Sequence, residues 1–170
     1  METNGKIRAG DIAKGAAAGL VGGLVASFVM NEFQALWTKL SNDDANTPEA
    51  KQQEPATVKA AEMVTQGTVG HQLTEAEKEY AGPAVHYAMG GTSGAIYGAM
   101  SELMPAATTG AGLPFGAAVW LVADEIAVPA LGLSRSPAEY PLSTHGYALV
   151  SHLVYGLTTE AVRRAARSIL

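Results

Sequence analysis

Two series of glycines, each with a spacing of four residues, constrain the fold of this chain more than any other feature of its sequence. The first series is Gly15, Gly19 and Gly23, and the second is Gly90, Gly94 and Gly98. On a helix, residues at this spacing lie along one face. In water a helical glycine costs about 1 kcal/mol relative to alanine, whereas in lipid small residues allow helices to pack closely. The two series therefore predict helix-packing faces within a membrane bundle.

The overall composition conceals this membrane character because one polar block dilutes it. Charged residues make up 16% of the 170 residues, below the roughly 25% of typical soluble domains, yet the mean hydropathy is only +0.10. The segment 38–82 holds eight of the acidic residues and four lysines. The rest of the chain consists mainly of long apolar runs.

Four segments of the chain are long and apolar enough to be predicted spans, since a helix needs about 20 residues to cross the hydrocarbon core. They are residues 12–37, 83–104, 113–131 and 144–162. We therefore expect an all-α, polytopic fold, a four-transmembrane-helix bundle in a single membrane domain covering residues 1–170. A soluble all-helical bundle is the alternative, and the lack of lysine and arginine in the centres of the four segments disfavours it.

Basic residues flank the two ends of the predicted bundle. Lys6, Arg8 and Lys14 precede the first span, and the cluster at 163–167 follows the fourth. No convincing cleavage site follows the first apolar run, so we interpret it as a retained span rather than a signal peptide. The positive-inside rule then predicts a multi-pass protein of the bacterial inner membrane with both termini in the cytoplasm.

The acidic segment 38–82 is expected on the outer face, with two short helices. Residues 56–66 follow Pro55 and end before Gly67. Residues 74–80 begin with a capping-box pattern, Thr74 followed by Glu77, and end before Gly82 and Pro83. Both are half-apolar, which suits short outer-surface helices lying over the mouth of the bundle.

The second and fourth predicted spans share a sequence pattern. Residues 93–102 and 151–160 both carry Ser, Tyr, Gly and Glu at equal offsets. The two spans run in the same direction through the membrane. The pattern indicates that the first and second helix hairpins are a parallel duplication, and structural repeats in membrane proteins often hold a site at their interface.

Ionisable residues at membrane depth form the candidate polar site, because a charge at the bilayer centre costs at least ~2.5–3.5 kcal/mol and is retained mainly for function. The candidate proton-relay residues are His86, Glu102, Asp124, Glu125, His152 and Glu160.

Each of these residues also has a mundane interpretation. Asp124 and Glu125 are the deepest, and their candidate partners are His152 and the tyrosines Tyr97 and Tyr155. Glu160 is expected to pair with Arg163 or Arg164 one turn further on, and His86 could be a polar cap at the outer mouth. At 1.5 Å per residue, His86 lies about 24 Å from Glu102, so these two cannot share a metal.

Several function classes are excluded or disfavoured. The chain has no cysteine, which excludes disulfides and Cys-based metal sites, and its net charge of −5 argues against nucleic acid as a partner. None of the usual phosphate-binding, hydrolase or zinc-protease motifs is found. We expect no enzyme activity, no catalytic residue and no cofactor.

The segments 81–87, 97–102 and 152–164 together resemble the YagU-like family of bacterial inner-membrane proteins, a domain family of unknown function. The resemblance rests on His86 and Glu102 in the second span, and on His152 and Glu160 with the following arginines in the fourth. Asp124 departs from the family pattern, which has a histidine there in one member. The resemblance implies an inner-membrane protein with no known catalytic mechanism, and one member of the family is linked to acid resistance.

Two non-enzymatic functions compete. The first is a structural or accessory subunit of a larger membrane complex or homo-oligomer, suggested by more glycine than one helix contact needs. The alternative is proton or small-solute handling linked to acid tolerance, and a haem or metal redox subunit is a weaker one. We expect the glycine series to meet only near Gly94–Gly98 against Gly19–Gly23, which leaves the rest of the second series open to the fourth helix or to a partner.

Overall fold

The computed structural model describes residues 8–41 and 54–170, and within these ranges it contains helices, turns and no strand. The predicted all-α fold is therefore confirmed. Residues 42–53 of the acidic segment 38–82 lie outside the described residues, as does Lys6. The elements are α1 (Ala9–Ser41), α3 (Ala56–Val69), α4 (Glu75–Leu103), η1 (Pro105–Thr108), α5 (Leu113–Trp120), η2 (Leu121–Ala127), α6 (Val128–Ala130), η3 (Pro137–Glu139) and α7 (Leu142–Arg167).

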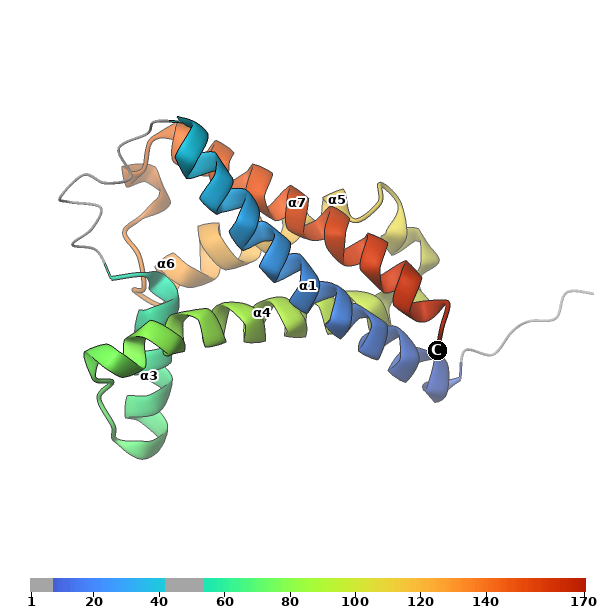
Figure 1. Ribbon diagram of the computed structural model, residues 1–170, viewed down its shortest axis with the longest axis horizontal. Coiled ribbons are helices and arrows are strands. Elements are labelled where there is room, and N and C mark those ends of the chain that lie inside the picture. The colour runs from blue at the N-terminus through green and yellow to red at the C-terminus, as the bar shows by residue number, and fades with distance from the viewer. Residues whose placement is uncertain (1–7, 42–53) are drawn as a thin grey trace, which may run out of the picture.

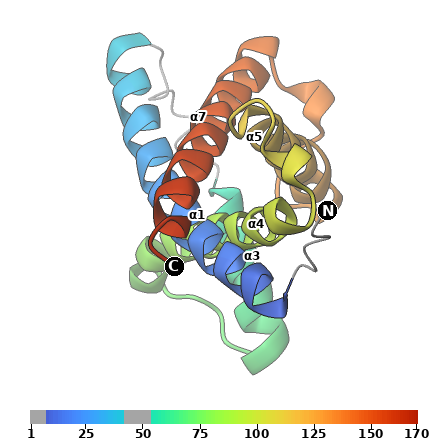
Figure 2. The same cartoon turned by 90° about the vertical axis from the view of Figure 1, so that its right-hand side faces the viewer.

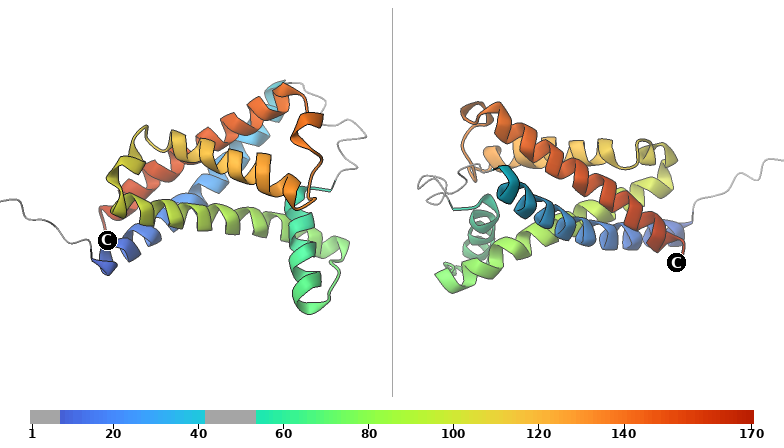
Figure 3. Two further views of the ribbon diagram at one scale, coloured as in Figure 1. Left: turned by 180° about the vertical axis from the view of Figure 1, so that it is seen from behind. Right: turned by 45° about the horizontal axis from the view of Figure 1, so that its top comes forward.

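Four long helical segments pack side by side, and one short helix projects from one end of the bundle (Figure 1). Helix α1 packs against both α4 and α7, α5 packs against α7, and α3 packs against α4. Seen along the bundle, α4, α1, α7 and α5 follow one another around it (Figure 2). The views in Figure 3 show α5, η2 and α6 running on as one rod beside α7.

Two predicted helix boundaries are wrong, and both involve glycine or proline. Helix α4 begins at Glu75 and continues through Pro83, so the second outer helix and the second span are one helix. A proline within a helix removes one hydrogen bond, and here the ring lies on an exposed stretch. Gly82 lets α3 approach, because a Cβ there would lie 2.8 Å from Val58 Cγ2. Helix α3 likewise continues through Gly67 to Val69 and ends at Gly70, whose φ is +68°.

The capping box predicted at the start of this helix is confirmed. The Thr74 hydroxyl accepts a hydrogen bond from the Glu77 backbone N–H at 3.4 Å. The Glu77 carboxylate accepts one from the Thr74 backbone N–H at 2.7 Å. These two bonds satisfy donors that a helix N-terminus otherwise leaves unpaired.

The third predicted span is helical over Leu113–Ala130, but its centre is a π-helix. Over Leu121–Ala127 the turn is wider, and the Val128 backbone N–H bonds to the Ala123 carbonyl five residues back. π-Helical turns inside α-helices often occur at functional sites. This one contains both Asp124 and Glu125.

The two glycine series face each other along their whole length. The contacts pair Gly15 with Gly98, Gly19 with Gly94, and Gly23 with Gly90. A Cβ on Gly94 would lie 2.8 Å from Gly23 Cα, too close for any side chain. The expectation of partial overlap, with part of the second series left open, is therefore wrong. Helices α1 and α4 cross in a register that places all three pairs in contact.

A second, shorter glycine contact joins α5 and α7. Gly112, which caps the N-terminus of α5, and Gly116 within α5 lie against the carbonyl groups of Gly156 and His152. The shared pattern aligns Gly156 with Gly98 and His152 with Gly94, which are the residues that face Gly15 and Gly19. The two hairpins thus pack through equivalent positions, which supports the predicted parallel duplication.

The interior of the bundle is small and polar, while its exterior is apolar. The largest fully buried side chains are Glu160, Thr159, Ser27 and Ser151. Large apolar side chains are instead exposed along the helices, including Leu24 at 40%, Phe28 at 54%, Ile96 at 56% and Ile126 at 55%. By length and composition, two of the described helical segments could cross a membrane, Ala9–Ser41 and Leu113–Ala130.

Candidate functional site

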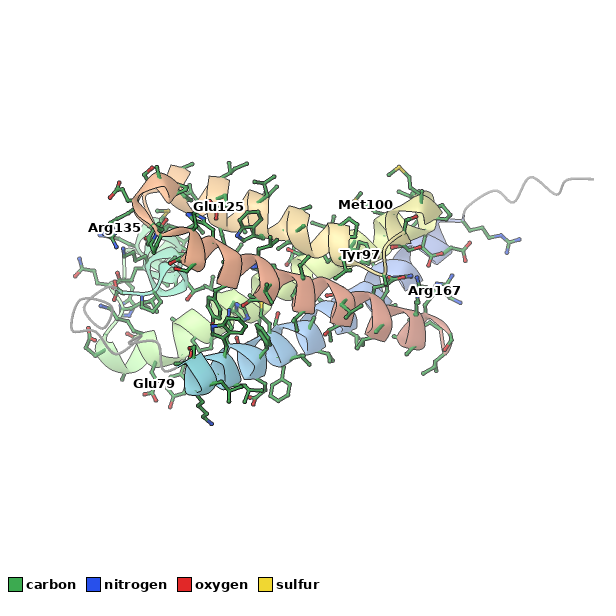
Figure 4. All side chains as sticks on the ribbon, turned by 90° about the horizontal axis from the view of Figure 1, so that it is seen from above. Glu79, Tyr97, Met100, Glu125, Arg135 and Arg167 are labelled. Atoms are coloured by element: carbon green, nitrogen blue, oxygen red, sulfur yellow. The ribbon has the colours of Figure 1, made fainter. Side chains whose placement is uncertain are left out.

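A cavity of about 490 Å³ lies between α1, α4, η2 and α7 at the end of the bundle that carries α3. Figure 4 shows Glu125 and Arg135 at this end, and Tyr97 and Arg167 toward the other. Helix α3 and the segment 131–140 also contribute to its wall. The ionisable side chains on the wall are His86, Asp124, Glu125, Arg135, His145 and His152.

Asp124 and His152 face each other across the cavity, as the sequence predicted. Asp124 Oδ2 lies 3.6 Å from His152 Nδ1. That nitrogen lies closer to the Ala148 carbonyl, at 2.9 Å, and therefore carries the proton that it donates to this carbonyl. The carboxylate is thus near the imidazole without a direct hydrogen bond to it.

Glu125 pairs with His145 rather than with His152. His145 Nδ1 lies 2.6 Å from Glu125 Oε1, and its Nε2 lies 3.0 Å from the Pro137 carbonyl. Since the Pro137 carbonyl can only accept, Nε2 donates, and the second proton is shared between Nδ1 and the carboxylate. Whichever of the two holds that proton, the Glu125–His145 pair has no net charge.

His86 supplies a third imidazole to the same wall, from α4. Its Nε2 atom is buried and has no hydrogen-bond partner among the described residues. A buried ring nitrogen in this state is available to accept or release a proton, or to bind a ligand.

Glu102 and Glu160 lie at the opposite end of the bundle, in ion pairs. Glu160 is 1% exposed, and its Oε2 accepts from Arg163 Nε at 2.6 Å, while Arg164 bonds to its other oxygen. The predicted pairing of Glu160 is confirmed. Glu102 accepts from Arg167 Nε at 2.7 Å, a contact between α4 and α7 that the sequence did not indicate.

The six predicted site residues therefore fall into two groups. The cavity wall holds four of them, His86, Asp124, Glu125 and His152. The other two, Glu102 and Glu160, form ion pairs with arginines at the opposite end of the bundle. Aromatic rings lie in the interior between these groups: Tyr97 stacks on Phe115 at 4.2 Å between centroids, and Phe115 contacts Tyr155. The Tyr155 hydroxyl donates to the Gly90 carbonyl at 2.7 Å, joining α7 to α4.

Helix α3 is attached to the rim of the cavity by polar contacts. Lys59 Nζ donates to the Leu133 carbonyl at 3.2 Å. Lys78 Nζ lies 2.9 Å from Glu54, 3.1 Å from Glu75 and 3.4 Å from Glu62. The hydrogen bonds that the Lys78 ammonium donates to Glu54, then to Glu75 and Glu62, raise its pKa. These contacts fix α3 to the start of α4.

Sequence reasoning missed several residues of this arrangement, although signals for some were present. His145 and His152 are seven residues apart, two helical turns on one face, which could have indicated two acid–histidine pairs. Gly112 and Gly116 repeat the four-residue glycine spacing. For Arg167 there was no local signal, since its partner Glu102 is 65 residues away.

The side chains of the cavity wall are of types that can exchange protons and recognise charge. Three imidazoles and two carboxyl groups share one confined space, and histidine changes its charge near neutral pH. Among the described residues, no group of three or more histidine, aspartate or glutamate side chains is arranged to hold a metal ion.

Comparison with known proteins gives one match. No curated protein matches the chain, and no solved structure does. The model of the family described as protein of unknown function (DUF1440) matches residues 39–161, from the end of α1 to the last turns of α7. The matched residues include all of α3, α4 and η2, the last of which carries Asp124 and Glu125. The chain therefore belongs to this family of proteins of unknown function, DUF1440.

Proposed function

We propose that this chain is a multi-pass membrane protein whose four long helical segments all span the bilayer. The inverted distribution of polarity supports this, because a soluble protein of this size would bury the large apolar side chains that this chain exposes. Helices α4 and α7 have lower hydropathy because they carry the buried serines, histidines and ion pairs of the interior. Their outward faces still present Ile96, Met100, Val150 and Leu157.

We further infer that this chain lies in a bacterial inner membrane, as the YagU-like family does, with both termini in the cytoplasm. Arg163, Arg164 and Arg167 gather at one end of the bundle with Lys14, whose Nζ donates to the Leu170 carbonyl. The exposed carboxylates of α4 lie at the other end. The positive-inside rule assigns the basic end to the cytoplasm.

Labelling of single cysteines tests this topology, and the chain has no native cysteine to interfere. Gln72→Cys lies between α3 and α4, and Ser168→Cys follows α7. In intact cells a membrane-impermeant maleimide should label the first variant and spare the second until the inner membrane is opened. Equal labelling of both in intact cells would contradict the proposed orientation.

The function supported best is the handling of protons or a small solute at the cavity, in the service of acid tolerance. One observation carries this proposal: His86, Asp124 with His152, and Glu125 with His145 all face one cavity of about 490 Å³. Ionisable groups are costly at membrane depth and usually mark ion or substrate pathways. Cavities of this size are typical of small-molecule sites.

The accessory-subunit function comes second. It was suggested by glycine faces in excess of one helix contact, but the two series contact each other. Exposed apolar side chains are compatible with a partner subunit and equally with lipid.

Proton flux in liposomes tests the favoured function. Purified protein is reconstituted around a pH-sensitive dye, and a pH gradient is imposed across the membrane. Replacing both cavity carboxyls, Asp124→Asn with Glu125→Gln, should abolish protein-dependent flux. The control, Glu79→Gln with Glu139→Gln, removes two exposed carboxyls at the same end of the bundle. Unchanged flux in the cavity variant would refute a proton pathway through this site.

A further inference from the structure

Asp124 is the one carboxyl group of the cavity that the described residues leave without a balancing charge. Glu125 is neutralised by His145, and no hydrogen-bond donor of the described residues reaches Asp124. Its nearest nitrogen, His152 Nδ1, lies 3.6 Å away and donates to the Ala148 carbonyl instead. The Asp124 side chain is 39% exposed, and at membrane depth a carboxylate is costly unless an opposite charge or a proton accompanies it.

Apart from Arg135 at the rim, the ionisable groups that line the cavity with Asp124 supply no fixed positive charge. Helix α4 contributes His86 and α7 contributes His145 and His152, while the lining residues of α1 are uncharged. Arg135 is exposed at the rim, and its guanidinium lies 5.1 Å from the centre of the Tyr140 ring. With His86 and His152 neutral, the centre of the cavity therefore carries one negative charge, that of Asp124.

The rest of the wall suits the hydrocarbon part of a ligand. It includes Met30, Val85, Met89 and Val119, with the rings of Tyr147 and Tyr155. Aromatic faces attract organic cations as well as apolar groups. A bare metal ion would need several oxygen or nitrogen ligands, which no cluster of the described residues provides.

We propose that the cavity binds a small lipophilic organic cation, an amine in its protonated or quaternary form, with Asp124 as its counter-ion. The inference rests on the proposed function and names the solute class for the same site. The cation replaces the proton that would otherwise neutralise Asp124, so the two compete for one place. Protonation of Asp124 removes the attracting charge, and protonation of His86 or His152 adds a repelling one.

Calorimetric titration of the purified full-length chain in detergent tests this inference. The probes are benzyltrimethylammonium, which stays charged at every pH, and benzyl alcohol, a neutral ligand with the same ring. At pH 8 the cation should bind at least about 10-fold more tightly than the alcohol, a difference of about 1.4 kcal/mol, because only the cation is attracted by the charge of the Asp124 carboxylate and by the aromatic faces. This preference should fall at least about 10-fold as the pH is lowered to 5, because imidazole groups of the cavity wall then take up protons and repel the cation.

Asp124→Asn should remove the preference for the cation, while Glu79→Gln, which removes an exposed carboxyl at the same end of the bundle, should preserve it. Equal affinity for the two probes, an unchanged preference in Asp124→Asn, or tighter cation binding in acid would each overturn the inference. The comparison of probes and the pH series use the unaltered chain, so they decide the matter even if Asp124→Asn fails to fold.

The outcome is separable from that of the proposed function. Proton flux in liposomes without cation binding would overturn the cation inference and leave the proposed function standing. Cation binding without proton flux would support the inference and contradict only proton conduction. If neither proton flux nor cation binding is observed, both the proposed function and the cation inference are overturned.

Discussion

The substitution Gly94→Ala tests whether direct backbone contact between α1 and α4 holds the bundle together. An alanine Cβ at this position would lie 2.8 Å from Gly23 Cα and 2.9 Å from Gly23 N, and would also press on the Gly19 carbonyl. All three atoms belong to the backbone of α1, so no change of side-chain rotamer relieves the overlap. At Gly90, by contrast, the nearest atom would be the Ser27 hydroxyl, which can rotate away.

The magnitude follows from the distances. Carbon atoms in contact normally lie about 3.5–4.0 Å apart, so the two helices would have to separate by about 0.7–1.2 Å. Overpacking of this kind typically costs about 1–3 kcal/mol. Alanine also favours the helix over glycine by up to about 1 kcal/mol, which would partly mask the cost in a single variant.

Gly146→Ala is the matched control, because Gly146 lies in α7 with no atom within 4 Å of its Cβ position. Both variants gain the same helix propensity, so the difference between them isolates the helix contact. In thermal unfolding followed by circular dichroism in detergent, Gly94→Ala should be less stable than Gly146→Ala by about 1–3 kcal/mol. That corresponds to about 2–4 °C in the unfolding midpoint for each kcal/mol.

Equal midpoints for the two alanine variants would refute the reasoning. They would mean that α1 and α4 do not touch at Gly94, or that they separate without cost.

Three further perturbations test other parts of the structure. Tyr155→Phe should lower the free energy of unfolding by about 0.5–1.5 kcal/mol through loss of its hydrogen bond to the Gly90 carbonyl, and an unchanged unfolding midpoint would contradict that bond. Arg163→Met should destabilise by up to about 3–5 kcal/mol because it breaks the buried pair with Glu160; the double variant that also carries Glu160→Gln should recover much of the loss, and no recovery would rule out the pair as the cause. The Glu77 carboxylate accepts hydrogen bonds from the backbone N–H and the hydroxyl of Thr74, and these lower its pKa from 4.5 to about 2. The capping box should therefore contribute fully above pH 4.5 and fade as the pH falls through about 2, so a Glu77 carboxyl titrating near 4.5 by NMR would contradict it.

The features that the sequence predicted correctly depend on residues close together in the chain. The Thr74–Glu77 capping box spans three residues, and the pairing of Glu160 with Arg163 and Arg164 spans one helical turn. Glycine spacing likewise identified the packing faces of two helices, because a four-residue period fixes one helical face.

The failed boundaries show where local rules stop. Gly82 and Pro83 usually end a helix, yet α4 continues through them with α3 packed against Gly82. A contact between helices decided this boundary, and no local pattern encodes it. The register of α1 on α4 is a similar case, since spacing names the faces but not the extent of their overlap.

The sequence alone therefore determined the helical class, the glycine faces and the ion pair within α7, since each follows from periodicity or from neighbours within one turn. Only the tertiary structure decided that Glu125 meets His145, that Glu102 meets Arg167, and that Asp124 faces a cavity without a hydrogen-bond donor from the described residues. These pairings join residues on different elements, 20 and 65 positions apart in the first two cases. They depend on how helices cross and on the wider π-helical turn, which are set by the packing of the whole bundle.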